Sequence, residues 1–243
     1  MRTDLAVFLG ILVAALASMP VYAARAARGR DPLDLAERGT FVLGSFVRSW
    51  FYWFVRPVER LSLALRLSPT TVNLLGVGFG AAAGLAFATG HLVLGGWGVL
   101  LGGVADVLDG RIARALGVEG PRGAFLDSTL DRFAEVGAFV GLAVYYQAST
   151  PALVVVAIGL GGSLLVSYAR ARGESVGVVC KVGVMQRAER LLAIGLGGIL
   201  DPAVSAGVGW AEGTLLFWLL VLVAAGTLGT AAYRTVWIAR RLG

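Results

Sequence analysis

Seven long apolar runs most constrain what this 243-residue chain can fold into. A bilayer core about 30 Å thick needs about 20 apolar residues for one helical crossing. The runs cover residues 5–23, 71–88, 92–108, 123–146, 152–168, 191–200 and 215–238. Apolar residues make up 57% of the chain and charged residues 15%. Both figures exclude an ordinary soluble domain and a disordered chain, and they predict an all-α integral membrane protein. The sixth run is short, and we expect its helix to end near Asp201 and Pro202.

The cations predict how these helices are oriented. Connections rich in arginine alternate with three connections, residues 89–91, 147–151 and 201–213, that contain no Lys or Arg. Arg2 is then the one member of the 21 Lys and Arg residues on the poor side. The positive-inside rule makes the rich side cytoplasmic, here of a bacterial-type inner membrane. On so apolar a chain, the net charge of +6 indicates contact with anionic lipid or phosphate substrates in preference to nucleic acid.

Residues 5–23 have two interpretations. A basic start, an apolar run and the stretch Val21-Tyr22-Ala23 resemble a signal peptide with a cleavage site. Asp4 and the dense arginines after the run favour a retained anchor. We therefore predict a membrane anchor and basic linker over residues 1–39 and one domain over residues 40–243.

Residues 40–67 show aromatic and aliphatic residues at helical spacing, with arginines between them. This pattern predicts an amphipathic helix in the cytoplasmic interface, anchored by its aromatic rings. An ordinary helix packed on the bundle is the alternative. The transmembrane bundle itself is expected over residues 71–238.

Two pairs of aspartates carry the chemistry. Asp106 and Asp109 are three residues apart, and Asp127 and Asp131 are four apart. At 3.6 residues per turn, each pair shares one helix face. A short connection joins the two helices, so the four carboxylates can converge on one point. A carboxylate in hydrocarbon costs about 2.5 to 3.5 kcal/mol, so these residues are functional candidates.

Four adjacent carboxylates repel one another unless a cation neutralises them. Hard divalent ions suit oxygen ligands, so we expect Mg²⁺ or Mn²⁺, with enough carboxylates for two ions. Gly110, Ala113 and Gly123 have small or no side chains, so a bulky group can approach the helix backbone beside the aspartates. Arg114 offers a positive charge that can pair with a phosphate. These features indicate phosphate-transfer chemistry. The alternative is a structural network of aspartate and arginine at the membrane surface.

Residues 106–131 resemble the signature of the CDP-alcohol phosphotransferase family, D-x2-D-G-x2-A-R-x8-G-x3-D-x3-D, at every fixed position. That family has an interfacial helix followed by six transmembrane helices, so residues 5–23 would be an added N-terminal transmembrane helix. The resemblance implies transfer of a phosphatidyl-type group from a CDP-linked lipid, such as CDP-diacylglycerol, to an alcohol, with release of CMP. It also implies a homodimer.

The resemblance assigns roles to individual residues. Asp106, Asp109, Asp127 and Asp131 would be metal ligands, and Asp131 would also be the general base on the acceptor hydroxyl. The residues expected to bind the CDP-lipid are Gly110, Ala113, Arg114, Gly123, Pro69 and Asn73. The last two lie in an element similar to the family's Pro-Asn-x-x-Thr, with Thr70 and Asn73 in place of its Asn and Thr.

A second stretch bears on the acceptor alcohol. Residues 167–174 and 186–190 resemble a basic pattern of phosphatidylinositol-phosphate synthases, with Gln186 and Ala188 as departures. The resemblance implies a phosphorylated polyol acceptor, inositol phosphate. The expected acceptor-binding residues are Arg170, Arg172, Arg187, Arg190 and Lys181. Glycerol 3-phosphate and serine are the rival acceptors, and positive-inside charge is the alternative interpretation of each arginine.

Two other functional classes fit parts of the pattern. A carboxylate-relay ion transporter usually shows internal repeats or broken helices, and the sequence shows neither. A passive scaffold would use only the arginine-rich face. Glycine stripes at positions 76, 80 and 84 and at 98 and 102 permit close helix contact, either within one bundle or between two copies.

Overall fold

The computed structural model describes residues 3–29 and 44–242, and the regular structure in these residues is α-helical. Its helices are α1 (Thr3–Ala27), α2 (Gly44–Phe54), α3 (Arg56–Ala64), α4 (Pro69–Ala88), α5 (Leu92–Leu116), α6 (Pro121–Tyr145), α7 (Thr150–Ser175), α8 (Arg187–Val208) and α9 (Thr214–Leu242). The prediction of an all-α protein is confirmed.

Six of the described helices are long and apolar enough to cross a membrane, namely α1, α4, α5, α7, α8 and α9. Helix α6 is 25 residues long but carries Asp127, Asp131, Arg132 and Glu135 along its length. It packs between α4 and α7, so it crosses the bilayer with them. The protein is therefore an integral membrane protein, as its composition predicts.

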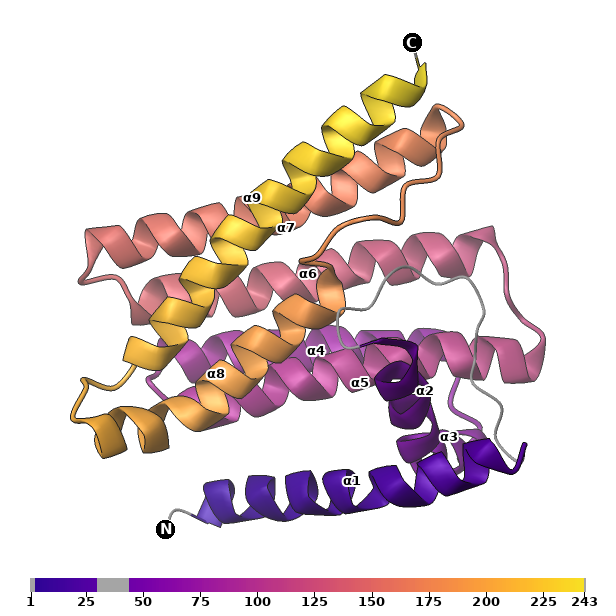
Figure 1. Cartoon of the computed structure of the whole chain (residues 1–243), viewed down its shortest axis with the longest axis horizontal. Coiled ribbons are helices and arrows are strands. Elements are labelled where there is room, and N and C mark those ends of the chain that lie inside the picture. Colours follow the sequence, from indigo (N-terminus) through magenta and orange to yellow (C-terminus); the bar gives the residue numbers. More distant parts are fainter. Residues whose placement is uncertain (1–2, 30–43, 243) are drawn as a thin grey trace.

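The six helices from α4 to α9 close into a ring. Each packs on two neighbours, in the spatial order α4, α6, α7, α9, α8, α5 and back to α4. The core between them is formed by large apolar side chains, including Phe87, Phe139, Leu216 and Leu220. The α5–α6 connection and the ends of α7 and α9 lie at one end of the bundle, and the connections without Lys or Arg lie at the other (Figure 1).

Helices α4 and α6 cross at very short range because glycine faces small residues along the contact. A Cβ atom added at Gly80 would lie 2.6 Å from Cα of Ala134, and one added at Gly84 would overlap the carbonyl group of Gly137. In the same way, a Cβ at Gly98 of α5 would lie 2.8 Å from Cβ of Ala83. The glycine stripes therefore serve packing within one chain, which is one of the two alternatives left by the sequence.

The single helix predicted over residues 40–67 is two helices in the structure, and its first four residues lie outside the described part of the chain. Helix α2 ends at Phe54, and α3 begins at Arg56 with Pro57 in its first turn. A proline ring clashes with the carbonyl group four residues earlier, here that of Trp53, which favours a break at this point.

Helix α1 rests on α2 by aromatic packing and one hydrogen bond. Trp50 Nε1 donates to Ser18 Oγ at 2.9 Å. The ring of Tyr22 is buried, with its centroid 5.6 Å from that of Phe46 and 5.7 Å from that of Trp53. The apolar face of the interfacial segment is thus partly used to hold the N-terminal helix.

The predicted end of the sixth span near Asp201 and Pro202 is wrong, because α8 continues through both residues to Val208. The carboxylate of Asp201 is fully buried and caps the next helix instead. Its Oδ1 accepts a hydrogen bond from the backbone N–H of Gly213 at 2.6 Å, and its Oδ2 accepts one from Leu216 at 2.9 Å. The free N–H groups at the start of α9 stabilise the negative charge of Asp201. From the sequence, Asp201 was expected in the connection after the sixth span.

Candidate active site

The two aspartate pairs meet inside the ring, near the arginine-rich end. Asp106 lies ten residues before the last residue of α5, and Asp131 lies ten residues after the first residue of α6, about 15 Å from each helix end. Gly117 ends α5 with a left-handed φ of 65°, which only glycine adopts easily, and the chain turns directly into α6. Because α5 and α6 run antiparallel and Asp106 and Asp131 lie at the same distance from their connection, the carboxylates come together.

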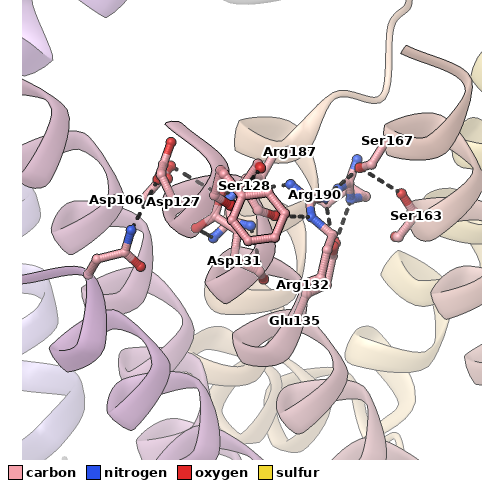
Figure 2. Close-up of polar contacts among 12 residues, drawn as sticks. Asp106, Asp127, Ser128, Asp131, Arg132, Glu135, Ser163, Ser167, Arg187 and Arg190 are labelled. Atoms are coloured by element: carbon pink, nitrogen blue, oxygen red, sulfur yellow. Dashed lines mark hydrogen bonds and ion pairs between the residues drawn. The ribbon is translucent and has the colours of Figure 1, made fainter. Parts of the chain in front are cut away.

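Three of the four carboxylates form a tight cluster (Figure 2). One oxygen from each of Asp106, Asp127 and Asp131 lies within 4.8 Å of the others. Asp109 is outside this triplet but lines the same cavity as Asp106 and Asp131. It is 5% exposed, and its buried Oδ2 has no hydrogen-bond partner among the described residues.

These residues fit a hard divalent cation. The donors are all carboxylate oxygens, the type that Mg²⁺ and Mn²⁺ prefer. A buried carboxylate oxygen without a partner is costly unless a cation or a donor completes its coordination, which is the situation of Asp109 Oδ2. Asn73 of α4 supports the cluster, because its Nδ2 donates to Asp127 Oδ1 at 3.5 Å.

Arg187 reaches the carboxylates from α8. Its Nη2 lies 2.8 Å from Asp131 Oδ1, and its Nε lies 3.5 Å from Asp106 Oδ2. Its Nη1 donates to the backbone carbonyl of Asp131 at 3.1 Å. One guanidinium thus links both aspartate-bearing helices and faces the candidate metal site.

A second ionic cluster lies one helical turn deeper in the bundle (Figure 2). Glu135 is buried, and its Oε1 accepts from Arg190 Nε at 2.9 Å while its Oε2 accepts from Arg132 Nη1 at 3.3 Å. Arg132 also donates to Ser167 Oγ of α7. Neither Glu135 nor Arg132 is among the functional residues predicted from the sequence. The available signal was that Glu135 follows Asp131 by four residues, on the same face of an otherwise apolar helix segment.

Four of the residues expected to bind the CDP-lipid lie closer to the α5–α6 connection than the carboxylates do: Gly110, Ala113 and Arg114 follow the aspartates of α5, and Gly123 precedes those of α6. A Cβ added at Gly110 would meet only Arg114 nitrogens, the nearer at 3.7 Å, and one added at Gly123 would meet nothing within 4 Å. Ala113 is half-buried, and Arg114 is exposed, 4.0 Å from Glu119. There is open space beside both glycines, as the expected approach of a ligand requires.

Pro69 and Asn73, the other two residues expected to bind the CDP-lipid, lie on α4. Pro69 is the first residue of α4, where its missing N–H costs nothing, and Ser68 caps the helix through the N–H of Thr71. Asn73 is buried one turn further on and contacts Asp127, as described above. Of the two residues, only Asn73 reaches the carboxylates directly.

The expected acceptor-binding residues do not converge on one point. Arg187 lies at the carboxylates, but Arg190 is 1% exposed and paired with Glu135, so the direct acceptor contact expected of it does not fit the structure. Arg170 is exposed and bonded to Glu174 at 2.9 Å, and Arg172 is exposed and near Ser175. Lys181 lies in the connection between α7 and α8 and is half-buried.

Comparison with known proteins agrees with this geometry. The model of a family described as CDP-alcohol phosphatidyltransferase matches residues 68–227. The chain is 35% identical over 224 residues to a phosphatidylinositol phosphate synthase of Streptomyces avermitilis, covering 88% of this chain and 89% of that relative.

Solved structures of the phosphatidylinositol phosphate synthase of Mycobacterium tuberculosis are also similar. The structure with CDP-DAG bound matches with a TM-score of 0.65 at 30% identity, over 75% of this chain and 92% of that one. The complex with manganese and citrate matches with a TM-score of 0.64 at 31% identity, over 74% and 88% of the two chains.

Proposed function

Since the chain belongs to the CDP-alcohol phosphatidyltransferase family, we propose that it transfers the phosphatidyl group of CDP-diacylglycerol to inositol phosphate and releases CMP. The observation that carries this function is the convergence of Asp106, Asp127 and Asp131 within 4.8 Å, on two helices that bear the family signature. Phosphate transfer needs such a site, because its catalysis consists mostly of positioning and charge neutralisation.

The carboxylates of Asp106, Asp109, Asp127 and Asp131 would hold Mg²⁺ or Mn²⁺. When bound, the ions neutralise the charge on the pyrophosphate oxygens and orient them. The charge balance supports two ions. The four aspartates and Glu135, set against Arg132, Arg187 and Arg190, leave two negative charges, and a bound pyrophosphate adds two more. Two divalent cations would balance the loaded site.

Asp131 is proposed as the base. The acceptor hydroxyl oxygen forms a bond to the phosphorus next to diacylglycerol, and the bond from that phosphorus to the bridging oxygen breaks, so CMP leaves with the electron pair. The hydroxyl proton moves to Asp131, whose Oδ2 lies 3.7 Å from Arg132, beyond hydrogen-bond range. Its Oδ1 is held by Arg187, so the carboxylate keeps one orientation.

Asn73, Gly110, Ala113, Arg114, Gly123 and Pro69 are proposed to hold the CDP-lipid. The open space beside Gly110 and Gly123 supports this assignment, because nucleotide and phosphate groups need close access to the helix backbone there.

Inositol phosphate is the proposed acceptor because Arg187 offers a planar fork next to the base. A phosphate on the acceptor would match this fork, and Arg170, Arg172 and Lys181 are proposed as further acceptor-binding residues. Glycerol 3-phosphate also carries a phosphate, whereas serine does not. The relatives named phosphatidylinositol phosphate synthase favour inositol phosphate.

The test uses the full chain, purified in detergent with Mg²⁺ and CDP-diacylglycerol. Inositol 1-phosphate, inositol, glycerol 3-phosphate and serine are offered separately, and both CMP and the radiolabelled lipid product are measured. We expect turnover with inositol 1-phosphate, and none in D131N that keeps the wild-type elution volume. Turnover with glycerol 3-phosphate alone would contradict the acceptor, and no CMP with any alcohol would contradict the function.

We also propose that the active site faces the cytoplasm, because the arginine-rich connections lie at its end of the bundle. The test replaces Cys180 by serine and introduces single cysteines at Glu119 or Glu212. A membrane-impermeant maleimide should label position 212 in intact cells and position 119 only after permeabilisation. The reverse pattern would contradict this orientation.

A homodimer is proposed from the family resemblance alone. The glycine stripes at 76, 80 and 84 pack inside one chain and add no support. Native mass spectrometry of the protein in detergent should find two copies per particle, and a uniform single copy would contradict it.

A further inference from the structure

Helices α6 and α8 face each other across the ring without packing backbone to backbone. Helix α6 packs on α4 and α7, whereas α8 packs on α5 and α9. Between them lies a cavity whose walls include Phe139 of α6 and Leu191 and Ile194 of α8, with Glu135 and Arg190 also in its lining. The relative height of the two helices is therefore set by long side chains that bridge the gap.

Two ionic bridges connect these helices, and each helix supplies residues about one turn apart. In the first, Arg187 of α8 binds both the carboxylate and the backbone carbonyl of Asp131. In the second, Arg190 Nε binds Glu135 Oε1 at 2.9 Å. The first bridge lies in the carboxylate site, and the second lies below it in the core.

Stability alone does not account for the second bridge. The side chains of Arg190 and Glu135 are 1% and 3% exposed, so both charges have lost their hydration. A well-packed apolar pair of similar volume is generally as stable as a buried ion pair. An ion pair differs in that it fixes a particular geometry, here the height of the first turn of α8 relative to α6.

Glu135 is itself held by a third helix. Its other oxygen accepts from Arg132, which also bonds to Ser167 of α7, and Ser167 Oγ in turn donates to the carbonyl of Ser163. The carboxylate therefore offers Arg190 a rigid partner, and a shift of α8 along α6 would break this contact first.

We propose that Glu135 is a positioning residue for the acceptor. Through Arg190 it fixes the first turn of α8, so that the guanidinium of Arg187 stands at the height where the acceptor's phosphate binds. This inference rests on the proposed function, in which Arg187 binds that phosphate. The CDP-lipid is held by α4, α5 and the start of α6, so the binding of the two substrates should respond differently when the bridge is lost.

The test replaces the pair together, as E135Q/R190Q, because this double variant removes both buried charges of the bridge, while Arg132 keeps Asp131 as an ionic partner at 3.7 Å. We expect the KM for inositol 1-phosphate to rise between about tenfold and 100-fold, the range in which small misplacements act, while the KM for CDP-diacylglycerol stays within about twofold. Calorimetric titration of the Mg²⁺-loaded protein with inositol 1-phosphate should show a parallel loss of affinity. R190K, which keeps the charge but loses the planar fork, should show a smaller rise in the same KM.

The matched control is D201N, which alters a buried carboxylate at the opposite end of the bundle. It should lower the melting temperature and leave both KM values unchanged. An unchanged acceptor KM in E135Q/R190Q, or an equal rise in both KM values, would overturn the positioning role. If the double variant does not fold, the same criteria apply to R190K. Wild-type protein that fails to use inositol 1-phosphate would overturn the proposed function instead, so the two failures are distinguishable.

Discussion

Arg187 occupies an unusual position for a cation. It is the first residue of α8, where the helix dipole disfavours positive charge, and its side chain is only 18% exposed. Asp106 and Asp131 compensate it, and in return its fork restricts both carboxylates to one arrangement. A lysine has a single ammonium group and cannot bind two carboxylates and a carbonyl in this way.

R187K is therefore expected to lower kcat/KM for inositol 1-phosphate. Losing part of a charge-assisted fork costs about 1.5 to 3 kcal/mol, or roughly 10- to 100-fold in kcat/KM. Steady-state CMP release at varied acceptor concentration measures the effect. R122K is the control, because Arg122 is exposed at the same end of the bundle. An equal loss in both variants, or no loss in R187K, would contradict a specific role for the Arg187 fork.

Metal removal should affect the fold as well as the reaction. The carboxylates of Asp106, Asp127 and Asp131 repel one another within 4.8 Å, so bound Mg²⁺ stabilises the folded chain by mass action, by about 2.7 kcal/mol at 100 times its Kd. EDTA should abolish CMP release and lower the melting temperature, and Mg²⁺ or Mn²⁺ should restore both. D127N should lose most of this metal-dependent shift in melting temperature, whereas the control D201N should keep it. A shift that persists in D127N would contradict the metal site.

At the level of the elements, the crossing of α4 and α6 determines where the aspartates of α6 stand. Small residues at Gly80, Gly84, Ala134 and Gly137 let the two backbones touch, so Asn73 of α4 comes within reach of Asp127. A side chain in place of Gly80 or Gly84 would separate the helices and withdraw the α6 carboxylates from those of α5.

G84A is expected to destabilise the protein by about 1 to 3 kcal/mol, the usual cost of overpacking. The added methyl group meets the backbone of Gly137, which cannot rotate away. G78A lies on the same helix, where an added Cβ meets nothing within 4 Å, and it should change stability by less than about 1 kcal/mol. Thermal unfolding in detergent compares the two, and equal melting temperatures would contradict the role of the crossing.

At the level of the whole molecule, the ring of α4 to α9 is complete without α1. Helix α1 contacts α2 and, more lightly, α8, and the family match begins at residue 68. Its contribution is to hold α2 through Trp50 and Tyr22. The catalytic helices do not depend on it for their packing.

Deleting residues 1–29 is therefore expected to leave CMP release per folded molecule within about threefold of the full chain, since losses away from the site are small. Size-exclusion chromatography and the turnover assay measure this. W50F, which removes the hydrogen bond to Ser18 and part of a buried ring but keeps α1, serves as the milder control. A deletion that folds but loses turnover would show that α1 takes part in the site.

Residue spacing along the chain was sufficient to predict the class of fold and the chemistry. Apolar runs of bilayer length leave few alternatives to membrane helices, and aspartates at three- and four-residue spacing share a helix face whatever the surroundings. Local spacing is enough for both conclusions. The break of the interfacial helix at Pro57 was equally readable from the sequence, but the periodicity on either side of it masked it.

The pairing of the charged residues, by contrast, depends on how the helices pack in three dimensions. Arg187 and Arg190 are both arginines in the first turn of α8, and their sequence context does not distinguish them. In the structure, Arg190 is paired with Glu135 in the core, whereas Arg187 faces the carboxylates. Asp201 reads as a loop residue and proves to cap α9. The partners in these pairs lie 12 to 56 residues apart in the sequence, so helix periodicity cannot identify them. They are set by how the ring closes, because a buried charge is stable only where another helix brings its partner.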